Sequence, residues 1–446
     1  MSERELLTGW GRTAPTAAQV SRLSADQIPT AVSAAGPRGV IARGLGRSYG
    51  DVAQNAGGGV LVTEPGGVDV DHDRRTARIG AGTSLHDVLR TLLPLGYFVP
   101  VTPGTRFVTL GGAVACDVHG KNHHRVGSLG NHIVELDLVT ADGAQRTISP
   151  TQEPELFWAT VGGLGLTGVI TSVVLELVPV ESGYMRVDTE RLADLDAVMD
   201  RIQAADRTAT HSVAWIDTMA KGRSLGRSVL SLGEHATRAD LTGRLRDEPL
   251  PSPGQPRLAA PALMPPGVVS RATVRAFNEL WFRKAPRHRV GEVQPIAPFF
   301  YPLDGVDHWS RLYGARGCVQ YQFVLPDPES GRLAVLLERV SADPAVTFLA
   351  VLKRFGPGNR GLLSFPTAGW TLAVDIPVRS GLAPMLQEWD REVADAGGRV
   401  YLAKDSRLSQ SMFDQMYPRA AEFRAVRRAI DPHWRFRSDL SRRLDL

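Results

Sequence analysis

The sequence predicts an α+β protein of two domains, and three observations lead to this prediction. The chain has 446 residues, more than one small hydrophobic core normally organises. Its 43% hydrophobic and 22% charged residues give the balance of an ordinary soluble protein. Short strand patterns and glycine-rich loops fill residues 38–180, and the character of the chain changes beyond residue 182. We therefore expect a first domain built around glycine loops and a second one of different construction.

The first half alternates strand patterns with turn residues. Ser84–Leu93 is expected to be a helix, because apolar residues recur there at helical spacing and Ser84 can cap its start. Ile133–Thr140 and Gln145–Ile148 are expected to pair through an Asp-Gly turn. The other elements expected here are the strands Val60–Thr63, Thr76–Ile79 and Val169–Val178 and the helix Glu153–Val161.

The second half carries longer helical patterns. Residues 249–267 hold so many prolines that we expect a mobile loop without a packed element. A basic helical tail ends the chain. The expected elements between them are the helices Asp188–Ala205, Glu329–Val340 and Gly381–Ala396 and the strands His211–Asp217, Arg227–Leu232, Val319–Leu325, Trp370–Pro377 and Arg399–Ala403.

Arg271–Arg289 combines many arginines with aromatic residues, and two interpretations remain open. The segment could be a membrane-facing edge. It could equally be a solvated helix that packs its apolar side inward, which is the interpretation that we favour.

Composition excludes several classes of function. A formal charge of +4 is weak for this length; it suits an anionic ligand but gives no case for nucleic acid. Cys116 and Cys318 cannot form a disulfide framework or a cysteine-rich zinc site. The N-terminus lacks the apolar region of a signal peptide, and glycines and Glu176 interrupt the apolar run Val161–Val180. We expect a cytoplasmic or membrane-peripheral protein without a transmembrane helix, with the cell-envelope face left open.

Two glycine-rich segments are the main candidates for a cofactor site. Arg43–Asp51 places three glycines among polar donors after an apolar stretch, so that successive N–H groups could converge on phosphate oxygens. A tight turn between strands is the alternative explanation of that segment. Pro103–Asn122 adds a run of small residues in which Thr105, Thr109 and His119 offer hydrogen bonds. An ordinary core would not discard so much side-chain volume, so a flat ring and a pyrophosphate are expected against this segment.

Two other motifs are rejected. Residues 163–168 match the dinucleotide fingerprint, but a helix precedes these glycines and a strand follows them, which reverses the Rossmann order. His119, His123, His124 and His132 form a cluster, but its neighbourhood is expected to be a loop and no carboxylates complete a site. We therefore expect no metal.

Motifs along nearly the whole chain resemble those of the vanillyl-alcohol-oxidase superfamily, whose members carry a PCMH-type FAD-binding domain. The motifs of both halves are most similar to those of members that oxidise a polyprenylphosphoryl ribose. The resemblance implies a two-domain fold with a sheet-based substrate (cap) domain at residues 183–398, between the FAD-binding parts 1–182 and 399–446. The motifs that carry it are GWGRT (9–13), ARGLGRSYGD (42–51), ACDVHGKNHH (115–124), GCVQYQF (317–323), FGPGN (355–359), AKDSR (403–407) and MYPR (416–419).

The resemblance implies which residues contact FAD. Several relatives attach the flavin through a histidine at the position of Arg47, and arginine cannot form that link, so FAD is expected to be non-covalent. The implied cofactor-binding residues are Arg43, Gly44, Leu45, Gly46, Arg47, Ser48, Tyr49, Gly50, Gly104, Thr105, Thr109, Leu110, Gly111, Gly112, Cys116, Asp117, Val118, His119, Ile170 and Tyr401.

The resemblance also implies the reacting residues. Lys404 is similar to the family's active-site lysine, acting as a base or as a stabilising cation, with His119 and Tyr49 beside it. Lys121, Gln320, Gln322, Lys353, Thr371 and Ala373 are the implied substrate contacts. Gln320 and Gln322 alternate on one strand and so share a face. Some relatives carry a cysteine at the position of Ala373, a thiol that this chain lacks.

The resulting hypothesis is FAD-dependent oxidation of the 2′-hydroxyl of a polyprenylphosphoryl-β-D-ribose, the first half of an epimerisation to the arabinose form used in cell-wall arabinan. A separate NAD(P)H-dependent keto-reductase would complete it, and the lipid-linked substrate suggests peripheral membrane contact. The alternatives are an alditol or aldonolactone oxidase acting on a soluble polyol, and a non-catalytic protein that binds lipid phosphates.

Overall fold

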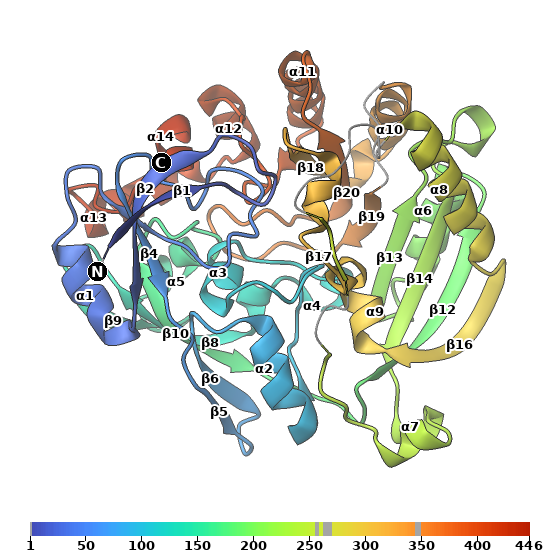
Figure 1. The fold of residues 1–446 in the computed structure, drawn as a ribbon, viewed down its shortest axis with the longest axis horizontal. Coiled ribbons are helices and arrows are strands. Elements are labelled where there is room, and N and C mark those ends of the chain that lie inside the picture. Colours follow the sequence, from blue (N-terminus) through green and yellow to red (C-terminus); the bar gives the residue numbers. More distant parts are fainter. Residues whose placement is uncertain (1, 255–257, 262–269, 344–348) are drawn as a thin grey trace.

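The computed structural model describes residues 2–254, 258–261, 270–343 and 349–446. Two smaller sheets and a larger one organise these residues, with the smaller sheets and the N-terminus on the left of Figure 1 and most of the larger sheet on the right. Helices and sheets are mixed, and the expectation of an α+β fold with two domains is confirmed. The exact boundaries at residues 182 and 398 stay a prediction.

The first part of the chain builds two sheets and the helices that pack on them. A four-stranded sheet has the order β1 (Glu3–Leu7), β2 (Thr16–Leu23), β4 (Gly59–Thr63) and β3 (Val40–Ala42). An antiparallel sheet has the order β5 (Val68–Asp71), β6 (Thr76–Gly80), β10 (Val169–Glu176), β8 (Ile133–Val139) and β9 (Gln145–Ile148). The helices of this first part are α1 (Ile28–Ser33), α2 (Leu85–Leu92), α3 (Leu110–Ala115), α4 (His123–Val126) and α5 (Pro154–Thr160). A separate strand pair joins β7 (Tyr97–Phe98) to β11 (Val178–Pro179).

The larger sheet is antiparallel throughout and has eight strands. Their order is β16 (His288–Pro295), β12 (Tyr184–Leu192), β14 (Ser228–His235), β13 (His211–Ile216), β19 (Ala350–Phe355), β20 (Gly369–Pro377), β18 (Cys318–Leu325) and β21 (Arg399–Val400). One face is apolar, where residues such as Tyr321 and Leu372 share a core with α6 (Leu195–Ala205), α10 (Arg332–Ala342) and α11 (Leu382–Asp395). The other face carries the polar residues of the candidate site.

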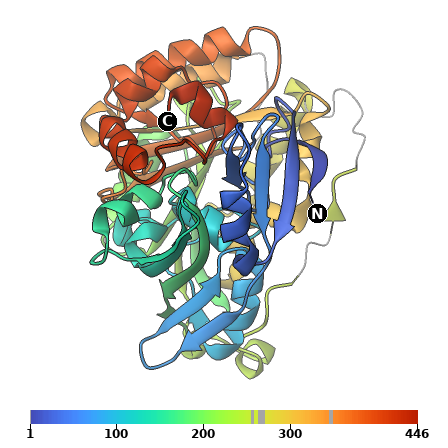
Figure 2. The same ribbon diagram turned by 90° about the vertical axis from the view of Figure 1, so that its left-hand side faces the viewer.

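The last helices return to the first part of the chain. They are α12 (Gln410–Met416), α13 (Ala420–Ile430) and α14 (Asp439–Leu444), and Figure 2 shows them above the strands of the first part. Phe436 forms a bridge with Val40, and Arg443 of α14 forms an ion pair with Asp51. The remaining elements are α7 (Arg244–Asp247), α8 (Arg271–Lys284), α9 (Ile296–Phe300), and the parallel pair β15 (Leu258–Ala259) and β17 (Val306–Asp307).

Several predicted elements are confirmed, and the local signals behind them are visible. The Ser84 hydroxyl caps α2 by accepting a hydrogen bond from the Asp87 N–H, and the Asp-Gly turn joins β8 to β9. A helix, α5, precedes the glycines of residues 162–168 and a strand, β10, follows them. The rejection of a Rossmann loop on that order is therefore confirmed.

Other expectations are wrong. A helix over Asp188–Ala205 is corrected, because the chain forms β12 up to Leu192 and α6 begins only at Leu195. β12 pairs with strands on both sides, and that tertiary pairing overrides the helical pattern. The last strand ends at Val400 rather than Ala403, and the histidine-rich segment expected to be a loop forms the short helix α4.

Two expectations concern the basic and proline-rich region. Part of residues 249–267 lies outside the described residues, but Leu258–Ala259 forms a paired strand where no packed element was expected. The favoured interpretation of Arg271–Arg289 is wrong, because Phe277, Leu280 and Trp281 of α8 are exposed instead of packed inward. Among the described residues, no helix is long and apolar enough to cross a membrane.

Candidate flavin and substrate site

The two glycine-rich segments meet in the structure. A Cβ atom at Gly44 would collide with the Thr109 hydroxyl, so only glycine allows this approach. A second contact between the two segments joins Ser48 and Cys116, whose Oγ and Sγ atoms lie 3.9 Å apart. Thr109 in turn caps α3 by accepting a hydrogen bond from Gly112 N at 3.2 Å. The expected cofactor segments therefore line one place.

The turn at residues 401–405 contacts both glycine-rich segments. The Tyr401 hydroxyl donates to the Cys116 carbonyl at 2.8 Å, and the Tyr49 N–H donates to the Ala403 carbonyl at 3.0 Å. A Cβ atom at Gly50 would collide with the Asp405 carbonyl, so this contact also requires glycine. Lys404 is thereby held beside the first glycine segment.

The residues at this place fit an anionic flavin nucleotide. Arg47 stacks on Trp10 at 4.1 Å, and its buried Nε has no hydrogen-bond partner among the described residues. His119 Nδ1 is likewise buried and without a partner in the described part of the chain. Beside Gly104 no described atom lies within 4 Å of where a Cβ atom would be. Unpaired buried donors and open space next to small residues are what a bound polar ligand would complete.

The polar face of the eight-stranded sheet supplies the other wall. The register of β18, β19 and β20 places Gln320, Gln322, Lys353, Thr371, Ala373 and Asp375 on one face. Gln320 Nε2 donates to the Tyr49 hydroxyl at 3.1 Å, and Gln322 Nε2 lies 2.9 Å from His119 Nε2. These two hydrogen bonds connect the sheet to the glycine segments, so the predicted cofactor and substrate residues adjoin each other.

Lys404 occupies the junction of the two walls. Its Nζ lies 4.2 Å from the centre of the Tyr49 ring, a cation–π distance. Burial lowers the pKa of Lys404 to about 8, and the nearby Asp375 carboxylate opposes that shift. A lysine with this pKa exists in both protonation states near neutral pH, as a proton-transfer group requires.

Asp375 is a site residue that the sequence analysis missed. It is fully buried, it accepts a hydrogen bond from Gln320 at 2.5 Å and one from Tyr313 at 3.4 Å, and burial raises its pKa to about 7. The signal was present: Thr371, Ala373 and Asp375 alternate along one strand, so a polar residue two positions beyond a predicted site residue shares its face.

His119 is held neutral among aromatic rings. Burial, and after it the charge of Lys353, lowers the pKa of His119 well below its ordinary value. With Gln322 donating to Nε2, the ring proton lies on Nδ1. The ring packs against Phe355 at 4.8 Å and Tyr401 at 5.2 Å between centroids. His119 is therefore placed to donate a hydrogen bond rather than to carry charge.

Two further lysines give the site a positive character. Burial lowers the pKa of Lys121 to about 7 and that of Lys353 to about 8, and each value is lowered further by a neighbouring lysine. Lys121 Nζ donates to the Phe299 carbonyl of α9 and lies 4.4 Å from the Phe299 ring centre. Cations that repel one another in this way favour an anionic ligand between them.

Comparison with known proteins decides the family. Residues 18–149 match the family model described as an FAD binding domain. The chain is 42% identical to decaprenylphosphoryl-β-D-ribose oxidase of Mycolicibacterium smegmatis, over 99% of this chain and 97% of that protein. This chain belongs to the decaprenylphosphoryl-β-D-ribose oxidase family. It is an FAD-dependent oxidoreductase, as expected from the motifs.

Two further relatives differ in their similarity to this chain. An uncharacterized Streptomyces coelicolor protein is 41% identical over 81% of this chain and 100% of its own length. Alditol oxidase of a Streptomyces species is 26% identical over 98% of both chains. Similarity to the alditol oxidase is thus much lower than to the decaprenylphosphoryl-β-D-ribose oxidase.

Some predicted cofactor residues have structural tasks. The Arg43 guanidinium donates to the carbonyls of Ala53 and Thr8, at 3.0 and 2.6 Å, and so braces its loop. The buried Asp117 carboxylate accepts from Ser128 at 2.8 Å and from the Gly130 N–H at 2.9 Å, which accounts for its place in the motif. Leu45 is exposed, and Ile170 lies buried on β10. Contacts of these four residues with FAD stay predictions.

The other predicted positions follow the segments that carry them. Gly46, Leu110, Gly111, Gly112 and Val118 lie within the two glycine segments or α3, and Thr105 accepts a hydrogen bond from the Phe107 N–H at 3.2 Å. No group of histidine, cysteine or acidic residues suited to a metal ion occurs in the described part of the chain.

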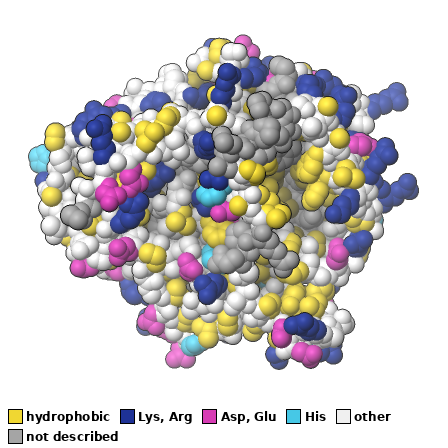
Figure 3. Space-filling model, viewed as in Figure 1, with side chains coloured by type: hydrophobic (Ala, Val, Ile, Leu, Met, Phe, Trp, Pro, Cys, Tyr) yellow, Lys and Arg dark blue, Asp and Glu magenta, His cyan; other side chains and the backbone are white. Residues whose placement is uncertain are grey.

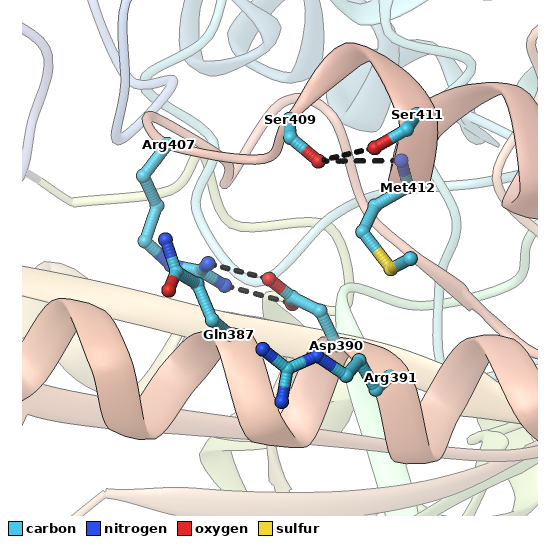
Figure 4. A pocket seen from close by; sticks show the side chains of 7 residues that line it. All are labelled: Gln387, Asp390, Arg391, Arg407, Ser409, Ser411 and Met412. Carbon is cyan, nitrogen blue, oxygen red and sulfur yellow. Dashed lines mark hydrogen bonds and ion pairs between the residues drawn. The ribbon is translucent and has the colours of Figure 1, made fainter.

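A cavity of about 210 Å³ lies elsewhere, between α11 and the start of α12 (Figure 4). At this cavity Arg407 forms a bidentate ion pair with Asp390, with hydrogen bonds of 2.5 and 2.8 Å. Asp390 also accepts from the Tyr321 hydroxyl at 3.1 Å, and Tyr321 alternates with Gln320 and Gln322 on β18. The cavity is therefore behind the sheet, on the face away from the candidate site.

Proposed function

We propose that this protein oxidises the 2′-hydroxyl of a polyprenylphosphoryl-β-D-ribose to the 2′-keto compound. The observation that carries the proposal is the whole-length similarity to decaprenylphosphoryl-β-D-ribose oxidase, together with a polar sheet face that meets the FAD-binding segments. The 2′-keto product would pass to a separate NAD(P)H-dependent reductase. Gln320 and Gln322 use their Nε2 hydrogens within the protein, which leaves their side-chain carbonyl oxygens to accept hydrogen bonds from the hydroxyl groups of a sugar.

Lys121 and Lys353 support a phosphate-bearing substrate. Both are half-buried lysines with lowered pKa values, and the charge of Lys353 is the neighbouring charge that lowers the pKa of Lys121. A phosphate between them would remove that repulsion and stabilise both ammonium groups. A soluble polyol carries no negative charge and would leave the repulsion between the two lysines in place. An alditol is therefore the weaker candidate for the substrate.

The protein's own residues would organise the reaction as follows. Bound FAD supplies the two-electron acceptor for the hydrogen on C2′. Lys404, neutral in part because its pKa is about 8, accepts the proton of the 2′-hydroxyl. His119 donates a hydrogen bond through Nδ1, and the aromatic rings of Phe355 and Phe365 around it exclude water. Tyr49 holds the lysine in place.

The cofactor is proposed to be non-covalent, because Arg47 stands where several superfamily relatives carry the linking histidine. In this structure the Arg47 guanidinium stacks on Trp10. An arginine side chain forms no covalent bond to a flavin. Its cationic group would instead pair with the anionic nucleotide.

The decisive experiment mixes the purified yellow protein anaerobically with prenylphosphoryl ribose. We expect bleaching of the flavin absorbance and formation of one equivalent of keto product. A parallel sample with xylitol should stay yellow; bleaching by xylitol but not by the ribose substrate would refute the proposal.

A matched pair of variants assigns the lysine. Lys404→Met should retain FAD and lose about 10²-fold or more in the bleaching rate. Lys221→Met, which changes an exposed lysine before the turn Gly222–Ser224, should behave as the unchanged protein. Full activity of Lys404→Met would remove this lysine from the mechanism.

A further inference from the structure

Helix α8 lies on the same face of the eight-stranded sheet as the candidate site. One transverse row of cross-strand partners runs through Gln322, Ala373, Val351, Trp215, Val229 and Arg191. Partners in an antiparallel sheet point to the same side. Arg191, at the far end of this row, donates to the Phe282 carbonyl of α8 at 3.5 Å. The helix therefore sits at the rim of the face that carries Gln322.

Specific polar contacts fix which side of α8 faces the protein. Asn278 is fully buried and donates to Asp217 at 2.7 Å, and Glu279 forms an ion pair with Arg227 at 2.6 Å. Val274 is the buried apolar residue on this side. The inward side of the helix is thus largely polar, which is unusual for a helix at a protein surface.

The outward side carries the large apolar residues instead. Leu280 is 68% exposed, Trp281 is 45% exposed, and Trp281 stacks with Phe277 at 6.0 Å. Val290 on the neighbouring edge strand β16 is 67% exposed. Figure 3 shows hydrophobic atoms beside Lys and Arg side chains at the right-hand edge of the molecule, where α8 lies in Figure 1. We call Phe277, Leu280 and Trp281 the α8 surface.

Basic residues surround the α8 surface. Residues 271–289 contain six Lys or Arg residues and a single acid, Glu279. Arg275, Lys284 and Arg287 are exposed and take part in no ion pair among the residues that the structure describes. Exposed aromatic and aliphatic side chains within a cationic rim complement a bilayer of anionic lipids.

We propose that the α8 surface docks the enzyme onto an anionic lipid bilayer. The idea rests on the proposed function in one respect: a polyprenyl chain lies in a membrane, and its phosphoryl sugar must reach the polar face. Docking at the rim of that face lets the sugar enter while the chain remains in lipid. The cationic rim favours lipid over a second protein, for which a neutral apolar surface would suffice.

The test is cosedimentation of the FAD-loaded protein with vesicles. We expect binding to vesicles of phosphatidylglycerol and phosphatidylcholine, weakened by salt, and little binding to phosphatidylcholine alone. The double variant Leu280→Ser, Trp281→Ser should bind about tenfold less well or worse. The control Leu6→Ser removes an equally exposed leucine, 71% exposed on β1, and should change nothing.

A second variant separates charge from apolar burial. Arg275→Glu with Lys284→Glu should abolish the preference for phosphatidylglycerol. The proposal would be overturned if the wild-type protein failed to bind the anionic vesicles, which is the result expected if the surface docks a protein instead. It would also be overturned if the α8 variants bound as well as the wild type.

Activity measurements keep this proposal distinct from the proposed function. The α8 variants should oxidise a short-chain, water-soluble prenylphosphoryl ribose at the wild-type rate and lose rate only with vesicle-embedded substrate. An equal loss with both substrates would refute docking. Failure of the wild type to oxidise either substrate would refute the proposed function and leave the vesicle result standing.

Discussion

Burial gives individual side chains of the site their chemistry. Lys404 lies at the junction of the two walls and Asp375 on the sheet, and burial shifts both pKa values toward neutrality, that of the lysine down to about 8 and that of the aspartic acid up to about 7. In water, each of these side chains would be fully charged at neutral pH. Their proximity keeps an exchangeable proton beside the Tyr49 ring.

The pH dependence tests the role of Lys404. A base must be neutral, and an amine with a pKa of about 8 loses its proton as the pH rises. The rate of anaerobic flavin bleaching should therefore rise through pH 8 and then level off. A rate that falls over this range would show that the ammonium form is required.

Asp375→Asn tests the coupling between the two walls. The Asp375 carboxylate opposes the lowering of the Lys404 pKa, so its removal should lower that pKa further. The rising limb of the pH–rate profile should move to lower pH. Gln320→Glu serves as the opposite case, because an added carboxylate near Tyr49 should move the limb upward.

The absence of a thiol at Ala373 has a pharmacological consequence. Ala373 is half-buried on the polar face and pairs with Gln322, at the position where the family resemblance implies a cysteine in some relatives. The Cys116 thiol is a poor nucleophile, because burial raises its pKa to about 11. Intact-mass measurement after turnover with inhibitors that bond to that cysteine should show no adduct, whereas Ala373→Cys should gain one.

At the scale of elements, the C-terminal helix α14 ties the site together. Arg443 forms two hydrogen bonds with Asp51, at 3.1 and 2.9 Å, and one with Asp405 at 2.9 Å. Asp51 ends the first glycine segment, and Asp405 follows Lys404. One guanidinium thereby ties the end of the first glycine segment to the residue that follows Lys404.

Arg443→Met should cost about 3 kcal/mol in the free energy of unfolding, because two largely buried carboxylates lose their partner. Chemical denaturation measures this cost. The control Arg419→Met removes an exposed ion pair with Glu422 and should cost less than about 1 kcal/mol. Equal costs would show that the Arg443 cluster is no more than a surface pair.

At the scale of the whole molecule, the proposed cofactor contacts come from distant parts of the chain. The two glycine segments, the turn around Lys404 and the larger sheet meet only in the folded protein. A ligand bound by that assembly, and not by the unfolded chain, stabilises it.

Removal of FAD should therefore lower the melting temperature, and added FAD should restore it. Acid precipitation should release all flavin into the supernatant, since Arg47 forms no covalent link. Flavin retained in the precipitated protein would contradict the proposed mode of binding, whatever the melting temperatures.

The sequence by itself determined the cofactor class, the family and most elements of the first half. These follow from local rules: the Ser84 cap, the Asp-Gly turn, and a helix before the glycines of 162–168. The glycines of the first segment follow the same logic, because the close approaches at Gly44 and Gly50 leave no room for a Cβ atom.

Only the tertiary structure decided the strand β12, the role of Asp375 and the exposed side of α8. β12 is a strand because two neighbours supply its hydrogen bonds, and no local pattern reports neighbours. The pKa values of Lys404 and Asp375 depend on burial between two walls that meet through long-range contacts. The apolar residues of α8 face outward because Asn278 and Glu279 find polar partners in Asp217, directly after β13, and Arg227, directly before β14. Periodicity shows that a helix has two sides, whereas the surrounding fold decides which one it buries.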